Sequence, residues 1–325
     1  MTSAGRHPRR PWWATPATWL YREVIALQHD KLRPLMFSIA YRMLGSVAEA
    51  EDVVQEAFLR MHKSTVDGKR IESAEAFATT ITTRLAIDAL RSARVRRELY
   101  VGPWLPEPLL TSDDDPAHRL ETDETVTTAF LILLESLSPV ERAVFLLREV
   151  FGYTYEDIAE VVEKSVANCR QIMARARRAV TERQPRFEAD RTHQVELSQR
   201  FLAAASGGDM TALHQLLTDD VEFVGDGGGR VPALGRPITG PTQVGRFVLG
   251  LLRQARRTDM RIELAEANGL AAWQAFAPDG GVLGVLTLAT TGDRIGAFYN
   301  VINPDKLRHI GPVGDLVALT QGTTP

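Results

Sequence analysis

The side chains that could do chemistry in this sequence are arginines crowded into two short segments. Residues 84–97 contain a single acidic residue, Asp88, and residues 164–186 contain only Glu182. The first group is Arg84, Arg91, Arg94, Arg96 and Arg97, and the second is Lys164, Arg170, Arg175, Arg177, Arg178, Arg183 and Arg186. Cationic groups gathered in this way bind phosphate oxygens, so both segments indicate a nucleic-acid partner.

The second basic segment has the layout of a helix that reads DNA. Ser165 is expected to cap a helix whose positive N-terminal end suits phosphate contact. Two short helices precede it, one starting at Ser138-Pro139 and one at Tyr155, as in a helix-turn-helix. Polar residues near the start of the last helix are placed to reach base edges, and basic ones further along to hold the backbone. The first set is Asn168, Arg170 and Gln171, and the second is Arg175, Arg177 and Arg178. An amphipathic helix with a merely solvated arginine face is the alternative.

Helices must position both basic segments. Apolar residues recur at helical spacing through residues 32–61 and 77–85, and again through 130–180. Between these modules, three prolines open a stretch rich in acids, which is the composition of a linker rather than of a helix. The prolines are Pro103, Pro106 and Pro108, and the acids are Glu107, Asp113, Asp114, Asp115, Glu121, Asp123 and Glu124. An acidic tether is therefore expected to join two basic helical modules.

After about Arg191 the pattern changes to that of an α+β domain. Helices are expected at residues 195–206, 210–217 and 243–256, with a strand ending at Asp226. The turn sequences Asn268-Gly269, Asp279-Gly280-Gly281 and Thr291-Gly292-Asp293 then separate apolar runs, which predicts successive antiparallel hairpins in a curved sheet. The expected fold class is multidomain: two all-α domains, the second with a helix-turn-helix, followed by an α+β domain.

Composition limits the function classes further. The 325 residues carry a net charge of -3, with 44% hydrophobic and 24% charged residues, which is typical of globular protein without a membrane span. Cys169 is the only cysteine, so no disulfide can form within the chain and a cysteine-based metal site is excluded. These features predict a cytoplasmic protein that uses no metal and no cofactor.

Two motifs in the first helical module resemble extracytoplasmic-function (ECF) sigma factors, which are promoter-reading subunits of RNA polymerase. Residues 50–60 (Ala-Glu-Asp-Val-Val-Gln-Glu-Ala-Phe-Leu-Arg) look like their region 2.2, and residues 83–91 (Thr-Arg-Leu-Ala-Ile-Asp-Ala-Leu-Arg) like region 2.3 to 2.4. The second module resembles region 4, so the resemblance covers about residues 21–183. One departure is Glu163, at a turn position where such proteins often use glycine; a left-handed conformation there would cost ~1 to 2 kcal/mol.

The resemblance implies a partner for each of these segments. Region 2.2 docks on the polymerase, and the acids in this segment complement a basic surface; the residues expected to face polymerase are Asp52, Gln55 and Glu56. Region 2.3 to 2.4 melts the minus-10 element by holding an unstacked base beside cationic side chains; its expected contacts are Arg84, Asp88, Arg91, Arg94, Arg96 and Arg97. Region 4 reads the minus-35 element, with Ser165, Asn168, Arg170, Gln171, Arg175 and Arg178 as the expected contacts. The spacing of Arg84, Asp88 and Arg91 also permits plain salt bridges within one helix.

The C-terminal domain resembles the SnoaL-like cone, and the whole chain looks like the sigma-J-like subgroup in which that cone is fused to the sigma domains. Three signatures carry this resemblance: Trp-Leu-Pro-Glu-Pro at 104–108, Asp-Gly-Gly-Gly-Arg at 226–230 and Asn-Pro-Asp-Lys-Leu at 303–307. The subgroup implies that the cone replaces a separate anti-sigma protein through contacts with the sigma domains or the polymerase. The expected regulatory contacts are Asp226, Gly227, Gly228, Gly229, Asn303, Pro304, Asp305, Lys306 and Leu307.

Local chemistry is compatible with both motifs as contact sites. Successive glycines after a strand permit positive φ and close backbone approach, which suits a docking loop or an anion cradle. Asn303-Pro304-Asp305 is expected to end the last strand and to cap a short helix from Lys306. The alternatives are a flexible loop and a simple strand-to-helix stop.

Two other function classes compete with this interpretation. SnoaL-like cones include isomerases and cyclases, so ligand binding or such an activity in the C-terminal domain is the alternative. The available acid or base groups are His214, Asp219, Asp220, Glu222 and Asp226. A polar dyad inside the cone would favour catalysis, whereas an apolar or plugged interior would favour regulation. A one-component repressor leaves the region 2.2 and 2.4 matches unexplained.

The sequence thus predicts a sigma factor that is not an enzyme and that directs promoter-specific initiation. Its expected partners are core RNA polymerase and promoter DNA, with an internal contact between the C-terminal domain and the sigma domains, no membrane, and a small cone ligand left open. The expected boundaries are 1–20 for an unstructured extension, 21–100 for region 2, 101–125 for the acidic linker, 126–186 for region 4, 194–312 for the cone and 313–325 for a tail.

Overall fold

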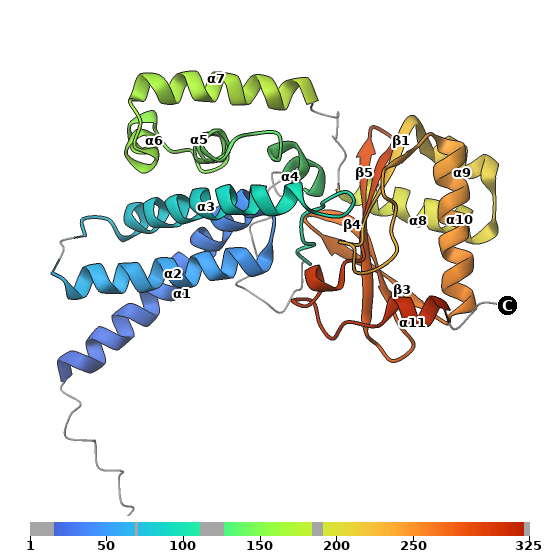
Figure 1. Cartoon of the computed structure of the whole chain (residues 1–325), viewed down its shortest axis with the longest axis horizontal. Helices are drawn as coiled ribbons and strands as arrows, with labels where there is room; N and C mark the ends of the chain where they lie inside the picture. The colour runs from blue at the N-terminus through green and yellow to red at the C-terminus, as the bar shows by residue number, and fades with distance from the viewer. Residues whose placement is uncertain (1–15, 69–70, 111–126, 184–190, 322–325) are drawn as a thin grey trace, which may run out of the picture.

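The computed structural model describes residues 16–68, 71–110, 127–183 and 191–321. Two groups of helices lie one above the other, and an α+β domain lies at one end of them (Figure 1). The element order confirms the expected fold class of two helical domains followed by an α+β domain.

The first helical domain contains α1 (Pro16–Leu44), α2 (Val47–Val66) and α3 (Ala74–Glu98). Helix α1 begins inside the segment that the sequence predicts as an unstructured extension; residues 1–15 lie outside the described ranges. The sharp passage from α1 to α2 uses Gly45 at a φ of 66° and Ser46, whose side chain accepts a hydrogen bond from the Glu49 amide.

The second helical domain contains α4 (Thr128–Leu134), α5 (Pro139–Glu149), α6 (Tyr155–Val162) and α7 (Val166–Arg183). Ser138 and Thr154 begin α5 and α6 with capping boxes, in which cap and third residue bond each other reciprocally. Helices α6 and α7 form the expected helix-turn-helix. At the turn, Glu163 has φ 54° and ψ 49°, which confirms the left-handed conformation at this non-glycine position.

The two helical domains share one continuous apolar core. Arg142 of α5 is buried between them, with 2% of its surface exposed. Its Nη1 donates to the Met43 carbonyl at the end of α1 (2.7 Å), and its Nη2 pairs with Glu135 (2.9 Å). Because a buried guanidinium needs such partners, this contact contributes to holding the two helical domains together in the arrangement seen here, called below the closed arrangement.

The α+β domain places three helices against a six-stranded sheet of order β2-β1-β6-β5-β4-β3. The helices are α8 (Arg191–Gly207), α9 (Met210–Leu216) and α10 (Pro241–Arg257); the strands are β1 (Leu217–Asp226), β2 (Ile238–Thr239), β3 (Arg261–Ala267), β4 (Leu270–Phe276), β5 (Val282–Thr291) and β6 (Arg294–Val301). The predicted turns at 268–269, 279–281 and 291–293 join β3 to β6 as antiparallel hairpins. Strand β1 pairs parallel with β6, which makes the sheet mixed.

Aromatic side chains fill the interior of this cone. Phe201 of α8 lies 5.7 Å from Trp273 and 5.0 Å from Phe298 between ring centroids. Phe223 stacks on Phe298 at 5.9 Å, and all four side chains are buried. A packed aromatic cluster therefore fills this part of the cone interior.

The first part of the linker between the helical domains is buried. Residues 103–110 are not helical, as their composition predicts, and Leu105, Glu107 and Leu109 are buried between the first helical domain and the cone. Leu110 even makes an isolated β-bridge with Ala267 of β3. The remaining acids of the predicted tether lie outside the described ranges.

No helix in the described ranges has both the length and the apolar composition needed to cross a membrane.

The left-handed Glu163 generates a stability prediction. Replacing it by glycine removes the steric cost of this conformation, whereas Glu163→Ala keeps that cost; both variants lose the exposed pair with Arg84 equally. We expect Glu163→Gly to be more stable than Glu163→Ala by about 1 kcal/mol in urea unfolding. Equal unfolding midpoints for the two variants would show that this turn stores no strain.

Candidate functional site

A buried carboxylate lies where the linker meets the cone. Asp226, at the end of β1, has 0% of its surface exposed. Its Oδ2 accepts hydrogen bonds from the Leu105 amide (2.8 Å) and from Lys306 Nζ (2.7 Å). Its Oδ1 accepts one from the Tyr100 hydroxyl (2.6 Å). One side chain of the cone thus joins the segment after β6 to two points of the linker region.

Lys306 completes this network. It also donates to the Leu105 carbonyl, and its ammonium lies 4.1 Å from the Trp104 ring and 5.0 Å from the Tyr100 ring. Burial lowers the pKa of Lys306, and the Asp226 carboxylate opposes that shift. Burial and the bond to Asp226 raise the pKa of Tyr100. The charges are therefore paired and solvated by protein groups, as a buried ion pair requires.

The lack of side chains in the glycine loop after Asp226 leaves room for Asn303 and other residues of this chain to pack against the loop. Gly228 has a φ of 58°, and a Cβ there would collide with the amide of Asn303 and lie 2.9 Å from the Tyr100 hydroxyl. A Cβ on Gly227 would lie 2.5 Å from the Val231 carbonyl, and one on Gly229 3.1 Å from Val101. The loop is thus packed against this chain's own residues.

Asn303 connects that loop to the turn that carries Lys306. Its Nδ2 donates to the Tyr100 hydroxyl (2.8 Å), and its Oδ1 accepts from the Asp305 amide (3.0 Å). The cap predicted for Asn303 is present, but the expected helix start at Lys306 was wrong. The turn is a single 3-10 helix, Pro304–Lys306, because proline fits its first position.

The remaining residues of this motif have separate contacts. Asp305 pairs with Arg230 (3.0 Å) and Arg308 (2.5 Å) near the surface. Leu307 is fully buried in the apolar cluster that also holds Leu105. The turn therefore contributes one polar anchor, one apolar anchor and an exposed ion-pair group.

A second anchor joins the cone to the first helical domain. Asn268, in the β3–β4 turn, donates from Nδ2 to the Tyr41 hydroxyl (2.5 Å), which donates to the Glu107 carbonyl (2.6 Å). Asn268 also exchanges two hydrogen bonds with the backbone of Leu109, at 2.8 and 3.2 Å. Burial raises the pKa of Tyr41. Sequence reasoning treated Asn268 only as a turn residue and did not select Tyr41.

The linker in turn supports α2 through Glu107. Its carboxylate accepts hydrogen bonds from the Ser46 hydroxyl and the Val47 amide, both at 2.7 Å. A carboxylate at a helix N-terminus is favoured by the free amides and the helix dipole. The linker is therefore connected to the helix that carries the predicted polymerase contacts.

A third anchor joins the cone to the second helical domain. The hydroxyl groups of Thr287 of β5 and Thr128 of α4 lie 3.4 Å apart. Ala129 of the same helix belongs to the apolar cluster that contains Leu105, Val285 and Leu307. The cone thus contacts both helical domains and the linker between them.

The residues predicted to face polymerase lie on α2. Asp52 and Gln55 are exposed, and Glu56 is half-buried and pairs with Arg60 at 2.7 Å. Leu59, one turn further along the same face, is 59% exposed. This face of α2 carries acidic and apolar side chains next to each other.

The residues predicted to contact the minus-10 element are divided among several contacts. Arg84 donates to the carbonyls of Val161 (2.9 Å) and Glu160 (2.8 Å) and pairs with Glu163 (3.0 Å), so it caps the C-terminus of α6. The exposed Asp88 pairs with Arg91 at 2.9 Å.

Arg97 is the most enclosed of the four members of this group whose side chains the structure describes, with 15% of its side chain exposed. It pairs with Glu135, donates to the Leu44 carbonyl (2.5 Å) and stacks 3.6 Å from the Trp104 ring centroid. Arg94 and Arg96 lie in α3, but their side chains are outside the part of the chain that the structure describes.

The residues predicted for the minus-35 element follow one exposed face of α7. Ser165 accepts a hydrogen bond from the Asn168 amide (3.2 Å), as its expected capping role requires, and Asn168 itself is half-buried. Arg170 and Gln171 are exposed in the following turn. Further along, Arg175 pairs with Glu141 (3.3 Å), Arg177 pairs with Glu149 (2.5 Å), and Arg178 is exposed.

The candidate catalytic groups do not meet inside the cone. Asp219, Asp220 and Glu222 are exposed, and the exposed His214 lies 3.2 Å from the Thr242 hydroxyl. Asp226 is held by the linker and Lys306. Across residues 16–68, 71–110, 127–183 and 191–321, no group of three His, Cys, Asp or Glu side chains is arranged to hold a metal.

Comparison with known proteins places this geometry in context. Residues 29–96 match the family model of sigma-70 region 2, and residues 128–180 match that of sigma-70 region 4. The chain is 39% identical to the ECF RNA polymerase sigma factor SigJ of Mycobacterium tuberculosis over 86% of its own length and 92% of that protein. It is 31% identical to the probable ECF RNA polymerase sigma factor SigI of the same organism, over 86% and 96%. The crystal structure of SigJ superposes with a TM-score of 0.72 and 32% identity, covering 90% of this chain and all of that one.

The Asp226 network generates a second stability prediction. Asp226→Asn removes the carboxylate that is hydrogen-bonded to the buried Lys306, and breaking a buried pair in this way costs about 3 to 5 kcal/mol. We expect a lower unfolding temperature of the cone and faster proteolysis of residues 100–110 than in the unaltered chain. Asp305→Asn, which removes only exposed pairs, is the matched control and is expected to cost ~1 kcal/mol or less. The buried pair has no special importance if the two variants behave alike.

Proposed function

The chain belongs to the ECF sigma factors of RNA polymerase, and on that premise we propose that its fused cone restrains promoter recognition. The chain directs core RNA polymerase to promoter DNA. In the proposal, residues 21–100 and 126–186 act as regions 2 and 4, and the cone of residues 194–312 holds them closed in place of a separate anti-sigma protein.

The observation that carries the proposal is that Arg84 and Arg97 are already bonded to other groups of this chain. Both are proposed to contact the minus-10 element, yet Arg84 bonds the end of α6 and Arg97 is enclosed by Glu135, Leu44 and Trp104. DNA phosphates must compete with these internal partners. The closed arrangement therefore opposes minus-10 binding.

The position of the cone supports its role as the restraint. It contacts the first helical domain through Asn268, the linker through Asp226 and the second helical domain through Thr287. Reading two promoter elements separated along the duplex requires the helical domains to part. These three anchors join the cone to both helical domains and to the linker at the same time, and they therefore oppose separation of the two helical domains.

We propose that the polymerase binds the exposed face of α2 before the cone releases the helical domains. Asp52, Gln55 and Glu56 are proposed as polymerase contacts, with Leu59 as an apolar addition to the same face. This face is exposed in the closed arrangement. Since Glu107 caps the same helix, polymerase binding at α2 can act on the linker and hence on the cone.

The exposed face of α7 is proposed to read the minus-35 element. Asn168, Arg170 and Gln171 occupy its first turns, where base edges are reached. Arg175 and Arg178 are proposed to bind phosphates, Arg175 after exchanging its contact with Glu141. Ser165 is proposed to support the same contact through its cap.

An enzymatic cone is the less supported candidate. Sigma factors are not enzymes, and we propose that the cone has no activity of its own because Phe201, Trp273 and Phe298 occupy its interior. The proposed place of action is the cytoplasm, where polymerase and promoter DNA are found.

Run-off transcription with purified core polymerase tests the restraint. Because Asp226→Asn weakens the anchor between cone and linker, we expect several-fold more transcript from the same promoter than with the unaltered chain. Asp293→Asn, which removes an exposed carboxylate of the β5–β6 turn away from the junction, is the matched control and is expected to behave like the unaltered chain. Equal or lower transcription by Asp226→Asn, with promoter binding intact, would contradict the proposed restraint.

Shortened chains locate the restraint within the cone. One ends near Arg191 and lacks the cone; the other ends just before Asn303 and lacks the anchor that carries Lys306. Both are expected to exceed the full chain in transcription. Failure of all forms to initiate at any promoter, including the promoter of their own gene, would refute sigma activity itself.

The proposed contacts of α7 can be separated by their sequence dependence. Arg170→Ala is expected to lower discrimination between matched and altered minus-35 elements, by about 1 to 3 kcal/mol. Arg178→Ala is expected to weaken binding evenly across sequences and to reduce the salt slope of binding by about 1. Fluorescence anisotropy of the holoenzyme on labelled promoters at several salt concentrations measures both; identical effects of the two variants would refute this division.

A further inference from the structure

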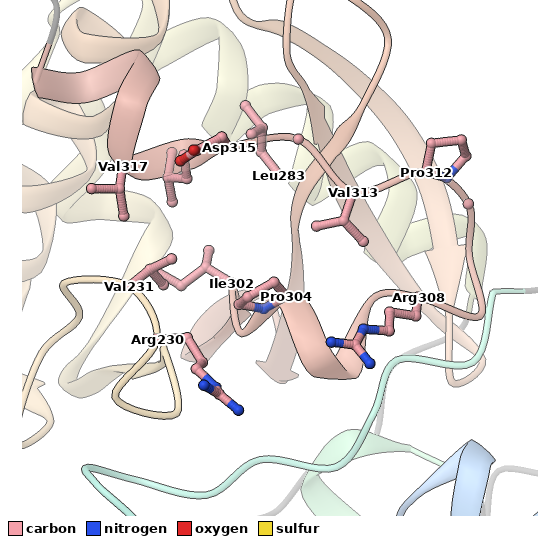
Figure 2. A pocket seen from close by; sticks show the side chains of 13 residues that line it. Arg230, Val231, Leu283, Ile302, Pro304, Arg308, Pro312, Val313, Asp315 and Val317 are labelled. Atoms are coloured by element: carbon pink, nitrogen blue, oxygen red, sulfur yellow. The ribbon is translucent and has the colours of Figure 1, made fainter.

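A hollow of about 560 Å³ lies beside the regulatory turn (Figure 2). It is bounded by the loop after β1, by the turn at Pro304 and by the C-terminal segment 311–317. It is separate from the aromatic interior of the cone. Its volume falls within the range of roughly 300–1,000 Å³ that is usual for small-molecule sites.

Part of the wall of this hollow is aliphatic and is held in place by the fold. This part consists of Val231, Leu283, Ile302, Val313 and Val317. Two backbone hydrogen bonds fix the C-terminal segment to Val282. The Val282 amide donates to the Pro312 carbonyl (2.8 Å), and the Gly314 amide donates to the Val282 carbonyl (3.0 Å). The hollow is therefore part of the folded domain and suits a hydrocarbon group.

Two arginines lie along one side of the hollow. Arg230 donates from Nε to Asp305 (3.0 Å), and Arg308 donates from Nη2 to the other oxygen of the same carboxylate (2.5 Å). Among the described residues, Asp305 is the ion-pair partner of both, so the three groups carry one net positive charge. Each guanidinium keeps further N–H donors in its planar fork, which matches a carboxylate.

The opposite side of the hollow discourages a second anion. Figure 2 shows Asp315 and Val317 across from Arg230 and Arg308. The Asp315 carboxylate accepts a hydrogen bond from the Ala318 amide (2.9 Å) and remains exposed. A ligand that fits this distribution has one anionic end and an uncharged remainder.

We propose that this hollow, called here the rim pocket, binds a small amphipathic carboxylate. The carboxylate bonds Arg230 and Arg308, and the hydrocarbon part lies along Ile302, Val313 and Val317.

The rim pocket is also placed to affect the cone's hold on the linker, a step that rests on the proposed restraint. A carboxylate that binds both arginines competes with Asp305 for their N–H groups. Asp305 belongs to the same 3-10 turn as Lys306, the partner of Asp226. The ligand thus favours release of the turn and raises transcription.

Calorimetric titration of the full chain tests the pocket directly. Octanoate, decanoate and dodecanoate are the probes, below their micellar concentrations, and the matching alcohols are the uncharged controls. We expect saturable binding of at least one carboxylate and binding at least tenfold weaker for its alcohol. Absence of binding by all three carboxylates would overturn the proposal.

Variants assign the binding to this site. The double variant Arg230→Gln with Arg308→Gln is expected to weaken binding at least tenfold, and Val313→Trp to do so by filling the hollow. The double variant Arg246→Gln with Arg253→Gln removes the same charge from the exposed face of α10 and is expected to bind as the unaltered chain does. Equal weakening by both double variants would show a general charge effect and refute the site.

Transcription separates the pocket from the restraint. The bound carboxylate is expected to raise run-off transcription of the full chain at least twofold and to leave Asp226→Asn unchanged. Binding without any change in transcription would overturn the effector role. The restraint itself is judged independently, by the Asp226→Asn variant without ligand.

Discussion

A carboxylate without access to water must find hydrogen-bond donors within the protein, and this requirement organises the junction around Asp226. Its donors are the Tyr100 hydroxyl, the Leu105 amide and the Lys306 ammonium, which come from the end of the first helical domain, the linker and the segment after β6. Withdrawal of any of these segments leaves the carboxylate underbonded, and withdrawal of Lys306 also leaves a buried charge uncompensated. The three segments are therefore expected to dock and separate together.

That shared dependence gives the closed arrangement its functional meaning. The linker contacts Asp226 through Leu105 and Asn268 of the β3–β4 turn through Leu109, and its Glu107 caps the start of α2. One extended segment therefore contacts both the cone and the first helical domain. Meanwhile Arg84 and Arg97 have protein partners where promoter DNA is proposed to bind. The same arginines can serve inhibition and recognition because carbonyl oxygens, carboxylates and phosphates all accept from a guanidinium.

Local signals in the sequence predicted most of the elements. Hydroxyl caps at Ser138 and Ser165, glycine turns between β3 and β6, and the left-handed Glu163 all follow from interactions within a few residues. Contacts across long sequence separations carried no such signal. Tyr41 and Asn268 are ordinary residues in their own segments, and the parallel pairing of β1 with β6 depends on how the chain returns to the sheet. The composition of the linker indicated that it is not helical, but it carried no signal that Glu107 is buried as a helix cap.

The central claim is that the cone holds the two helical domains together, and a distance between them measures this most directly. Spin labels introduced by Lys63→Cys on α2 and Ala174→Cys on α7, both exposed positions, in a Cys169→Ala background report that distance by pulsed electron resonance. The account predicts one narrow, short distribution for the free chain, and a broader, longer one when Asp226→Asn is added. A distribution that stays narrow and short in the Asp226→Asn variant would contradict it.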